Sequence, residues 1–99
     1  MSEYYDRQGS PITMNQWAAM FKDWDVKNVA QSDVGVSGDT VHVSTVWLGM
    51  NHQWMPDGRP LIFETLVQGG SLSQEMDRYA TEAEALTGHA AMCERVQAS

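Results

Sequence analysis

Two β-rich runs within the stretch from Val41 to Gln68 constrain the fold of this chain more than any other feature. The runs, Val41 to Leu48 and Leu61 to Val67, are rich in the β-branched and aromatic residues that suit a pleated strand. The polar connection between them includes Pro56-Asp57-Gly58, in which proline presets φ for a turn and glycine accepts positive φ. The sequence therefore predicts an antiparallel pair of strands.

The side chains of both runs alternate between two faces, as they do in any strand. One face of the pair consists of Val41, Val43, Thr45 and Trp47 together with Leu61, Phe63, Thr65 and Val67. The opposite face is not cleanly polar either. We therefore expect a sheet that helices cover on one side and that chain or a partner partly covers on the other.

The residues before this pair predict a helix and a further strand. Thr13 and Gln16 fit a capping box, and a helix from about Met14 to Trp24 follows. Its apolar stripe consists of Trp17, Met20, Phe21 and Trp24. Residues 29–31 and 34–36 then predict a first strand, which turns at Ser37-Gly38-Asp39 into the Val41 run.

The residues after the pair predict a fourth strand and a closing helix. The strand spans Leu72 to Tyr79, and one of its faces consists of Leu72, Gln74, Met76 and Arg78. A second capping box from Thr81 to Glu84 begins a helix that runs to about Gln97. Its expected apolar face consists of Ala83, Leu86, Ala90, Cys93 and Val96, and we expect Gly88 to serve close packing. The predicted class is α+β: an antiparallel meander sheet of three or four strands with an N-terminal and a C-terminal helix packed against it.

Length and composition narrow the classes of function. We expect the 99 residues to form a single α+β domain spanning residues 1–99. Six Lys and Arg against 13 Asp and Glu give a formal charge of −7, which argues against direct nucleic-acid binding. One cysteine, Cys93, allows neither an intrachain disulfide nor a cysteine metal cage. No run is apolar enough for a membrane span or a signal peptide, so we expect an intracellular protein without membrane association.

No catalytic, metal-binding or cofactor-binding motif is visible, so the sequence gives no support for an enzyme. None of the three histidines, His42, His52 and His89, has metal-ligand spacing. We expect His89 to be a hydrogen-bonded structural residue on the helix flank over the sheet. We expect His42 and Glu64 to be cross-strand neighbours.

Four further residues are candidates for a binding site. Glu64 lies in an apolar run and needs a donor, for which Arg78 on the next strand is the expected partner. The tryptophan of the first run, Trp47, is most simply a core residue. In the polar loop, Trp54 is either an exposed binding residue or folded back over the sheet edge.

Four segments of the chain resemble a family of small, functionally uncharacterised proteins of actinobacteriophages and their actinobacterial hosts. They are Val43-Ser44-Thr45-Val46-Trp47-Leu48-Gly49, Pro60-Leu61-Ile62-Phe63-Glu64-Thr65, Arg78-Tyr79-Ala80-Thr81 and Ala85-Leu86-Thr87-Gly88-His89. The resemblance extends from the Tyr4-Tyr5-Asp6 opening to the closing helix, and it brings no catalytic residues. It implies a phage accessory protein in the bacterial cytoplasm or, alternatively, a minor component of the virion.

Three hypotheses of function remain, in order of preference. The first is a non-enzymatic phage accessory protein that binds a host or phage protein through the sheet face or the Trp54 loop, and that forms a homodimer. The second is a module for a small, nucleotide-like ligand, with a pocket between the sheet and the C-terminal helix lined by Trp47, Glu64, Arg78 and His89. The third, an acidic mimic of nucleic acid, ranks last because the 13 acidic residues are scattered and interleaved with basic ones.

Overall fold

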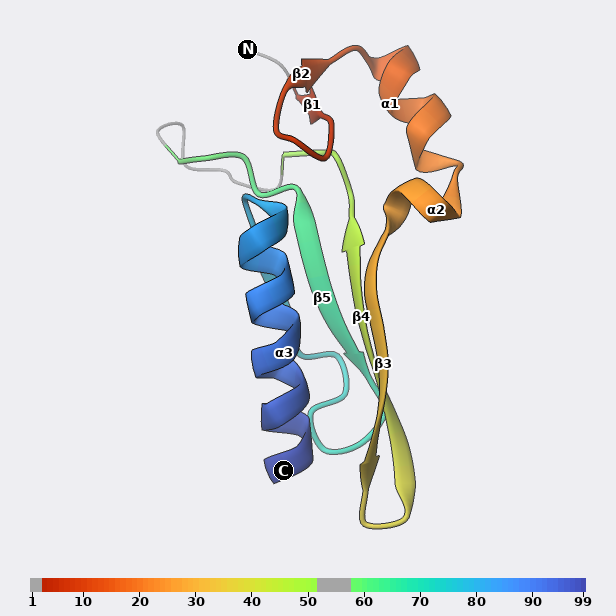
Figure 1. Ribbon diagram of the computed structural model, residues 1–99, viewed down its shortest axis with the longest axis vertical. Helices are drawn as coiled ribbons and strands as arrows, with labels where there is room; N and C mark the ends of the chain where they lie inside the picture. Colours follow the sequence, from red (N-terminus) through yellow and green to blue (C-terminus); the bar gives the residue numbers. More distant parts are fainter. Residues whose placement is uncertain (1–2, 52–57) are drawn as a thin grey trace.

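In the computed structural model, which describes residues 3–51 and 58–99, four strands form an antiparallel sheet in the order β3-β4-β5-β6 (Figure 1). Their bounds are Asn28–Val36 for β3, Asp39–Trp47 for β4, Phe63–Gln68 for β5 and Met76–Tyr79 for β6. The C-terminal helix α3 (Glu82–Ala98) lies along one face of this sheet. The α+β meander predicted from the sequence is therefore confirmed, with four strands.

The N-terminal elements lie at one end of the sheet, beyond the ends of β4 and β5 (Figure 1). A small ribbon of β1 (Tyr4–Tyr5) and β2 (Pro11–Ile12) leads into α1 (Met14–Phe21) and the short α2 (Trp24–Lys27). The indole of Trp17 attaches α1 to the sheet by donating a hydrogen bond to the carbonyl oxygen of Leu48 at 2.8 Å. The N-terminal helix thus closes the end of the core instead of covering a face.

The capping box at Thr13 and Gln16 is present as predicted, but α1 is shorter than expected. It ends at Phe21 because Asp23 begins a new helix, where its carboxylate accepts from the backbone N–H of Asp25 at 3.0 Å. Trp24, the last residue of the expected apolar stripe, therefore lies outside α1. Trp24 is 53 % exposed, whereas the three residues before it in the stripe pack against the core.

The first hairpin is the one predicted from the sequence. Both residues of its turn have positive φ, 51° at Ser37 and 86° at Gly38. Such a two-residue turn matches the twist of the flanking strands and fixes Val36 opposite Asp39. Strand β3 is therefore held in one register from Ala30 to Val36, and the register shifts between Asn28 and Ala30.

The alternation predicted for both runs is confirmed, and α3 covers the face of the sheet that includes Trp47. In β4 this face carries Val41, Val43, Thr45 and Trp47, and in β5 it carries Phe63, Thr65 and Val67, all at most 2 % exposed. The predicted position of Leu61 is wrong, because β5 begins only at Phe63. The neighbouring Ile62 is buried instead, and its carbonyl oxygen accepts from the N–H groups of Leu48 and Gly49.

The predicted apolar face of the closing helix is confirmed at Val96 and Cys93, which pack in the core, and is wrong at Ala83, Leu86 and Ala90. The buried residues of α3 are Ala85, His89, Met92 and Val96, whereas Leu86 is 47 % exposed and Ala83 and Ala90 are exposed. The sequence pattern misleads because it counts His89 as polar. In the fold, the ring of His89 is buried with hydrogen-bond partners for both nitrogens, so the side of α3 that contains His89 faces the sheet.

The fourth strand is also shorter than predicted. Residues 71–74 form a turn in which Gln74 has a φ of 75°, and pairing begins only at Met76. Leu72 packs against the core from this turn, so Leu72 and Gln74 do not share a strand face with Met76 and Arg78. The Gly69-Gly70 pair, at φ of 99° and 70°, gives the chain the conformational freedom to turn here.

Candidate functional site

The sheet separates the candidate residues into two groups. Trp47 and His89 lie on the side covered by α3, and Glu64 and Arg78 lie on the opposite side, which we call the open face. These four residues therefore do not line one pocket between the sheet and α3. Trp54 and His52 lie outside the described residues.

His89 is the centre of a buried chain of polar side chains. It is 7 % exposed; its Nε2 lies 2.8 Å from the Ser32 hydroxyl and its Nδ1 lies 2.7 Å from the Thr45 hydroxyl. The Thr45 hydroxyl in turn bonds that of Thr65, which also bonds the Tyr79 hydroxyl. This chain crosses the core between its two apolar clusters, one around Val43 and Met92 and one around Trp47 and Phe63.

The electrostatics of this chain match a structural role for His89. Burial lowers the pKa of His89, and the charge of nearby His42 lowers it further, so the ring is neutral at neutral pH. Ser32 lies within hydrogen-bonding distance of His89, as the nucleophile of a catalytic triad does. The second ring nitrogen of His89, however, faces the Thr45 hydroxyl, whereas a catalytic triad has a carboxylate at this place. Neither of the two cavities found in the described part of the chain is lined by Ser32 or His89. The hydrogen bonding expected of His89 is confirmed.

On the open face, the predicted ion pair is confirmed. Arg78 Nε lies 3.2 Å from Glu64 Oε2, and the two residues are directly paired between β5 and β6. The Glu64 side chain keeps 18 % of its exposure and that of Arg78 37 %. The donor that a carboxylate in an apolar run requires is therefore supplied across the strands.

The expected contact between His42 and Glu64 is wrong, because the β4–β5 register places His42 opposite Gln68. His42 instead bonds two residues of β3, Asp33 through Nδ1 at 2.7 Å and Gln31 through Nε2 at 2.8 Å. The open face thus has a polar group on β3 and β4 and an ion pair on β5 and β6.

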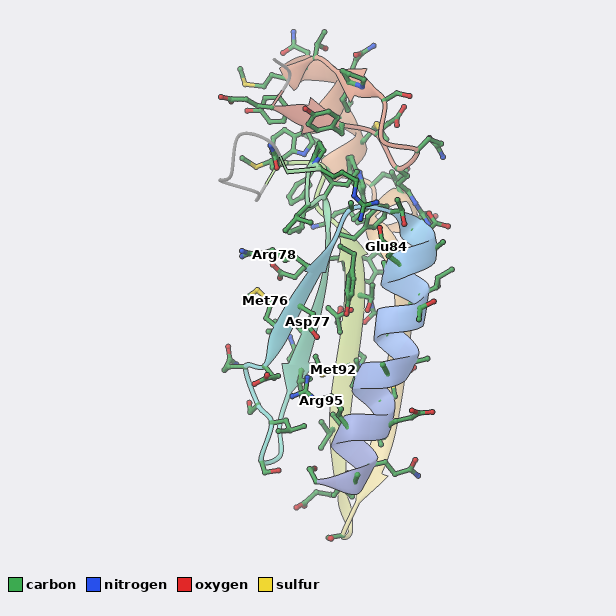
Figure 2. The ribbon with its side chains drawn as sticks, turned by 90° about the vertical axis from the view of Figure 1, so that its left-hand side faces the viewer. Met76, Asp77, Arg78, Glu84, Met92 and Arg95 are labelled. Atoms are coloured by element: carbon green, nitrogen blue, oxygen red, sulfur yellow. The ribbon has the colours of Figure 1, made fainter. Side chains whose placement is uncertain are left out.

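Between these two polar groups, the open face has an apolar centre formed by Leu66 and Met76, and Val46 lies beside it, directly opposite Glu64. Leu66 is paired directly with Met76, which is 42 % exposed. Figure 2 shows Met76 and Arg78 on the side of β6 away from α3, whereas Asp77 lies toward α3, where Arg95 approaches it at 3.9 Å. None of the helices in the described part of the chain covers this apolar centre.

A cavity of about 510 Å³ lies beside the N-terminal end of α3. Its lining includes Tyr5, Arg7, Arg59, Thr81 and Glu82, so it holds both charge signs. Hydrogen bonds from Thr81 and Arg59, which both line this cavity, lower the pKa of Glu84. None of the described candidates, Trp47, Glu64, Arg78 and His89, lines this cavity.

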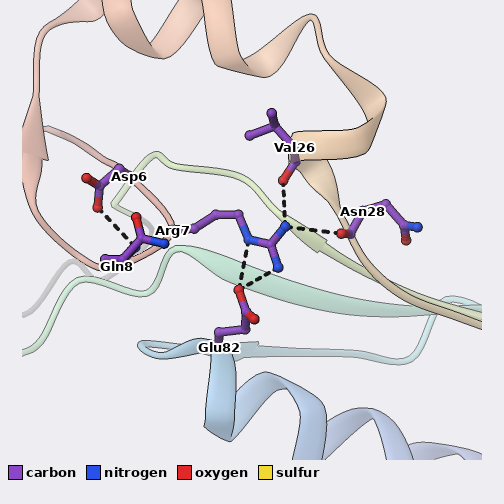
Figure 3. A network of polar contacts seen from close by, with 6 residues as sticks. All are labelled: Asp6, Arg7, Gln8, Val26, Asn28 and Glu82. Carbon is purple, nitrogen blue, oxygen red and sulfur yellow. Dashed lines mark hydrogen bonds and ion pairs between the residues drawn. The ribbon is translucent and has the colours of Figure 1, made fainter.

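Arg7 holds the wall of this cavity together (Figure 3). Its Nε donates to Glu82 Oε1 at 2.8 Å, and its Nη1 donates to the carbonyl oxygens of Val26 at 3.2 Å and Asn28 at 3.4 Å. One side chain therefore joins the N-terminal segment, the start of β3 and the start of α3. Nothing in the local sequence marks Arg7 for this role, because its partners are 19 to 75 residues away.

Comparison with protein-family models, with curated proteins and with solved structures finds no match for this chain. Among residues 3–51 and 58–99, no group of three or more His, Cys, Asp and Glu side chains is arranged to hold a metal ion. None of the helices in that part of the chain combines the length and the apolar character needed to cross a lipid bilayer.

Proposed function

We propose that this protein is a non-enzymatic interaction protein that binds another protein through the open face of its sheet. The observation that carries the proposal is the apolar centre of Leu66 and Met76, which lies between the Glu64–Arg78 ion pair and the His42 group. An apolar centre with a polar rim is the usual anatomy of a protein–protein interface. The phage accessory role implied by the family resemblance gives the context, a host or phage protein as partner.

The open face suits a protein better than a small molecule because neither Leu66 nor Met76 lines either of the cavities beside α3. Its charged groups are already paired within the chain, so a partner adds apolar contact without leaving a buried charge unpaired. Such paired charges select a partner through complementary charges on its rim. The Trp54 loop remains a predicted second contact.

The test is a pull-down from lysate of phage-infected actinobacteria with the wild-type chain and two lysine variants. Met76→Lys places a charge in the apolar centre, and Leu86→Lys places the same charge on the outer surface of α3, where Leu86 is 47 % exposed. We expect a partner that the wild type and Leu86→Lys retain and Met76→Lys loses. Equal retention by both variants, with unchanged thermal midpoints, contradicts a role of the open face.

A second candidate function, binding of a small nucleotide-like ligand, is favoured by the cavity beside α3. Its volume of about 510 Å³ and its mixed charges are those of a small-molecule site. Native mass spectrometry of the freshly purified, untagged protein tests it. An added mass that disappears on denaturation and is absent from Arg59→Ala supports this function, and a bare chain mass contradicts it.

A further inference from the structure

The two edges of the sheet differ in how well they are protected against pairing with another strand. Strand β6 has four residues, of which Asp77 and Arg78 are charged. At the other edge, β3 has nine residues without proline, and Asp33 is its single charged residue. Proteins usually protect edge strands by shortness, charge, proline or a bulge. Strand β3 has one charge, Asp33, and one register shift, between Asn28 and Ala30, and residues 30–36 form a regular edge.

The hairpin turn determines which backbone groups of β3 are free to pair. A two-residue turn with positive φ at Ser37 and Gly38 is closed by a hydrogen-bonded pair, Val36 with Asp39. Because hydrogen-bonded and non-hydrogen-bonded positions alternate in an antiparallel ladder, Gln31, Asp33 and Gly35 direct their N–H and C=O groups away from β4. Among the described residues, these groups have no backbone partner.

We propose that β3 pairs antiparallel with β3 of a second copy of this chain, around a two-fold axis at Ser32. The pairing joins two four-stranded sheets into one of eight strands. It places Gln31 opposite the partner's Asp33, and Gly35 opposite the partner's Val29. The outward backbone groups of Gln31 and Asp33 then gain hydrogen-bond partners, and Gly35 meets the partner strand where its register shifts.

The register follows from charge and length. A two-fold axis at Asp33 would place two carboxylates directly opposite each other, which destabilises a strand pair. An axis at Gln31 would leave Gly35 and Val36 without partners. The axis at Ser32 pairs residues 30–34 of both copies within the regular part of β3 and sets the Asp33 carboxylate against an uncharged amide.

The side of β3 that faces α3 also favours a second copy as the occupant. It carries Ala30, Val34 and Val36, and Val34 and Val36 are partly buried hydrophobic residues packed against the core. In the proposed register Ala30 lies opposite the partner's Val34, so two apolar rows meet under the two C-terminal helices. A two-fold axis requires each surface to complement itself, and this edge does. The dimer is independent of the partner proposed for the open face.

The test compares two isosteric substitutions of glutamine by glutamate. Gln31→Glu places a carboxylate opposite the partner's Asp33 twice in each dimer, while its Oε1 still accepts from His42. Gln68→Glu makes the same charge change opposite His42 on β5, away from the edge. We expect sedimentation velocity to show a dimer of the wild type and of Gln68→Glu, and a roughly tenfold or greater rise in the dimer Kd for Gln31→Glu.

Two further measurements keep the proposal open to refutation if Gln31→Glu is poorly folded. Gly35→Pro removes an outward N–H, which an unpaired edge strand tolerates and a paired strand does not. Hydrogen exchange should protect the amides of Gln31 and Asp33 in the wild type and in Gln68→Glu, and should leave them unprotected in Gln31→Glu.

Three results overturn the proposal. A wild type that is monomeric at all concentrations refutes the dimer. A dimer that survives both Gln31→Glu and Gly35→Pro uses another surface. A dimer that Asp33→Asn tightens and Gln31→Glu leaves unchanged has its axis at Asp33, which refutes the register.

Discussion

Replacing Gly88 by alanine tests how closely α3 approaches the sheet. In an exposed helix interior, alanine is more favourable than glycine by about 1 kcal/mol. At Gly88, however, the added Cβ would lie well inside van der Waals distance of the Tyr79 hydroxyl and two of its ring carbons. The Tyr79 ring cannot move away freely because its hydroxyl is hydrogen-bonded to Thr65.

The expected result is a net destabilisation. Overpacking costs about 1–3 kcal/mol, and the lost hydrogen bond to Thr65 about 1 kcal/mol more, against the gain of about 1 kcal/mol in helix propensity. The balance is a loss of about 1–3 kcal/mol, or a thermal midpoint lower by roughly 5–20 °C. Urea unfolding followed by far-UV circular dichroism measures the free energy of unfolding directly.

The effect of Gly88→Ala on the free energy of unfolding should change sign when the Tyr79 ring is removed. In a Tyr79→Val background the ring that Cβ meets is gone, so Gly88→Ala should stabilise the protein by about 1 kcal/mol relative to Tyr79→Val alone. Thr87→Ala, at the exposed neighbouring position, reports the effect of helix propensity without a clash. If Gly88→Ala has the same effect in both backgrounds, Tyr79 is not the residue that requires glycine here.

Three other predictions concern the polar contacts of the fold. Thr45→Val removes two buried hydrogen bonds, and we expect a loss of about 1–3 kcal/mol in urea unfolding; an unchanged midpoint would show that the hydroxyl is dispensable. Burial lowers the pKa of His89 from its ordinary value of 6.5, so below this pH the unfolded chain binds more protons than the folded chain. The stability that neutral His89 contributes is therefore complete above pH 6.5 and is lost as the pH falls below it. In His89→Leu this part of the pH dependence of unfolding should disappear, and its persistence would assign it to other groups. Glu82→Gln weakens the anchor of Arg7, and hydrogen exchange of the N-terminal segment should become faster while that of β4 stays unchanged; equal protection of both segments would contradict the role of this ion pair.

The parts of the fold that follow from local patterns could be predicted from the sequence. The capping boxes at Thr13 and Thr81, the turn at Ser37 and Gly38 and the inner face of β4 each depend on residues close together in the chain. The pairing of Glu64 with Arg78 could also be predicted, because a carboxylate in an apolar run requires a donor on a neighbouring strand.

The features that escaped prediction depend on distant residues. The inner face of α3 is decided by Ser32 and Thr45, which satisfy His89 from two strands of the sheet. The cavity beside α3 requires Arg7 to meet Glu82 across 75 residues. The register that separates His42 from Glu64 is set by the pairing of whole strands, and alternation along one strand carries no information about it.

The buried chain from Ser32 to Tyr79 has a consequence for how uniquely the protein folds. The alanine-rich helix α3 presents two stripes of similar apolar character, one through His89 and Met92 and one through Leu86 and Ala90. Hydrophobic contact alone distinguishes poorly between these two stripes, so the helix could rotate about its axis at small energetic cost. The hydrogen bonds of His89 remove that degeneracy, because rotation of α3 would break the bonds from the His89 ring to Ser32 and Thr45. A redesign of this chain of residues in valine and leucine would therefore keep the protein compact but yield an ensemble of helix orientations in place of one native state.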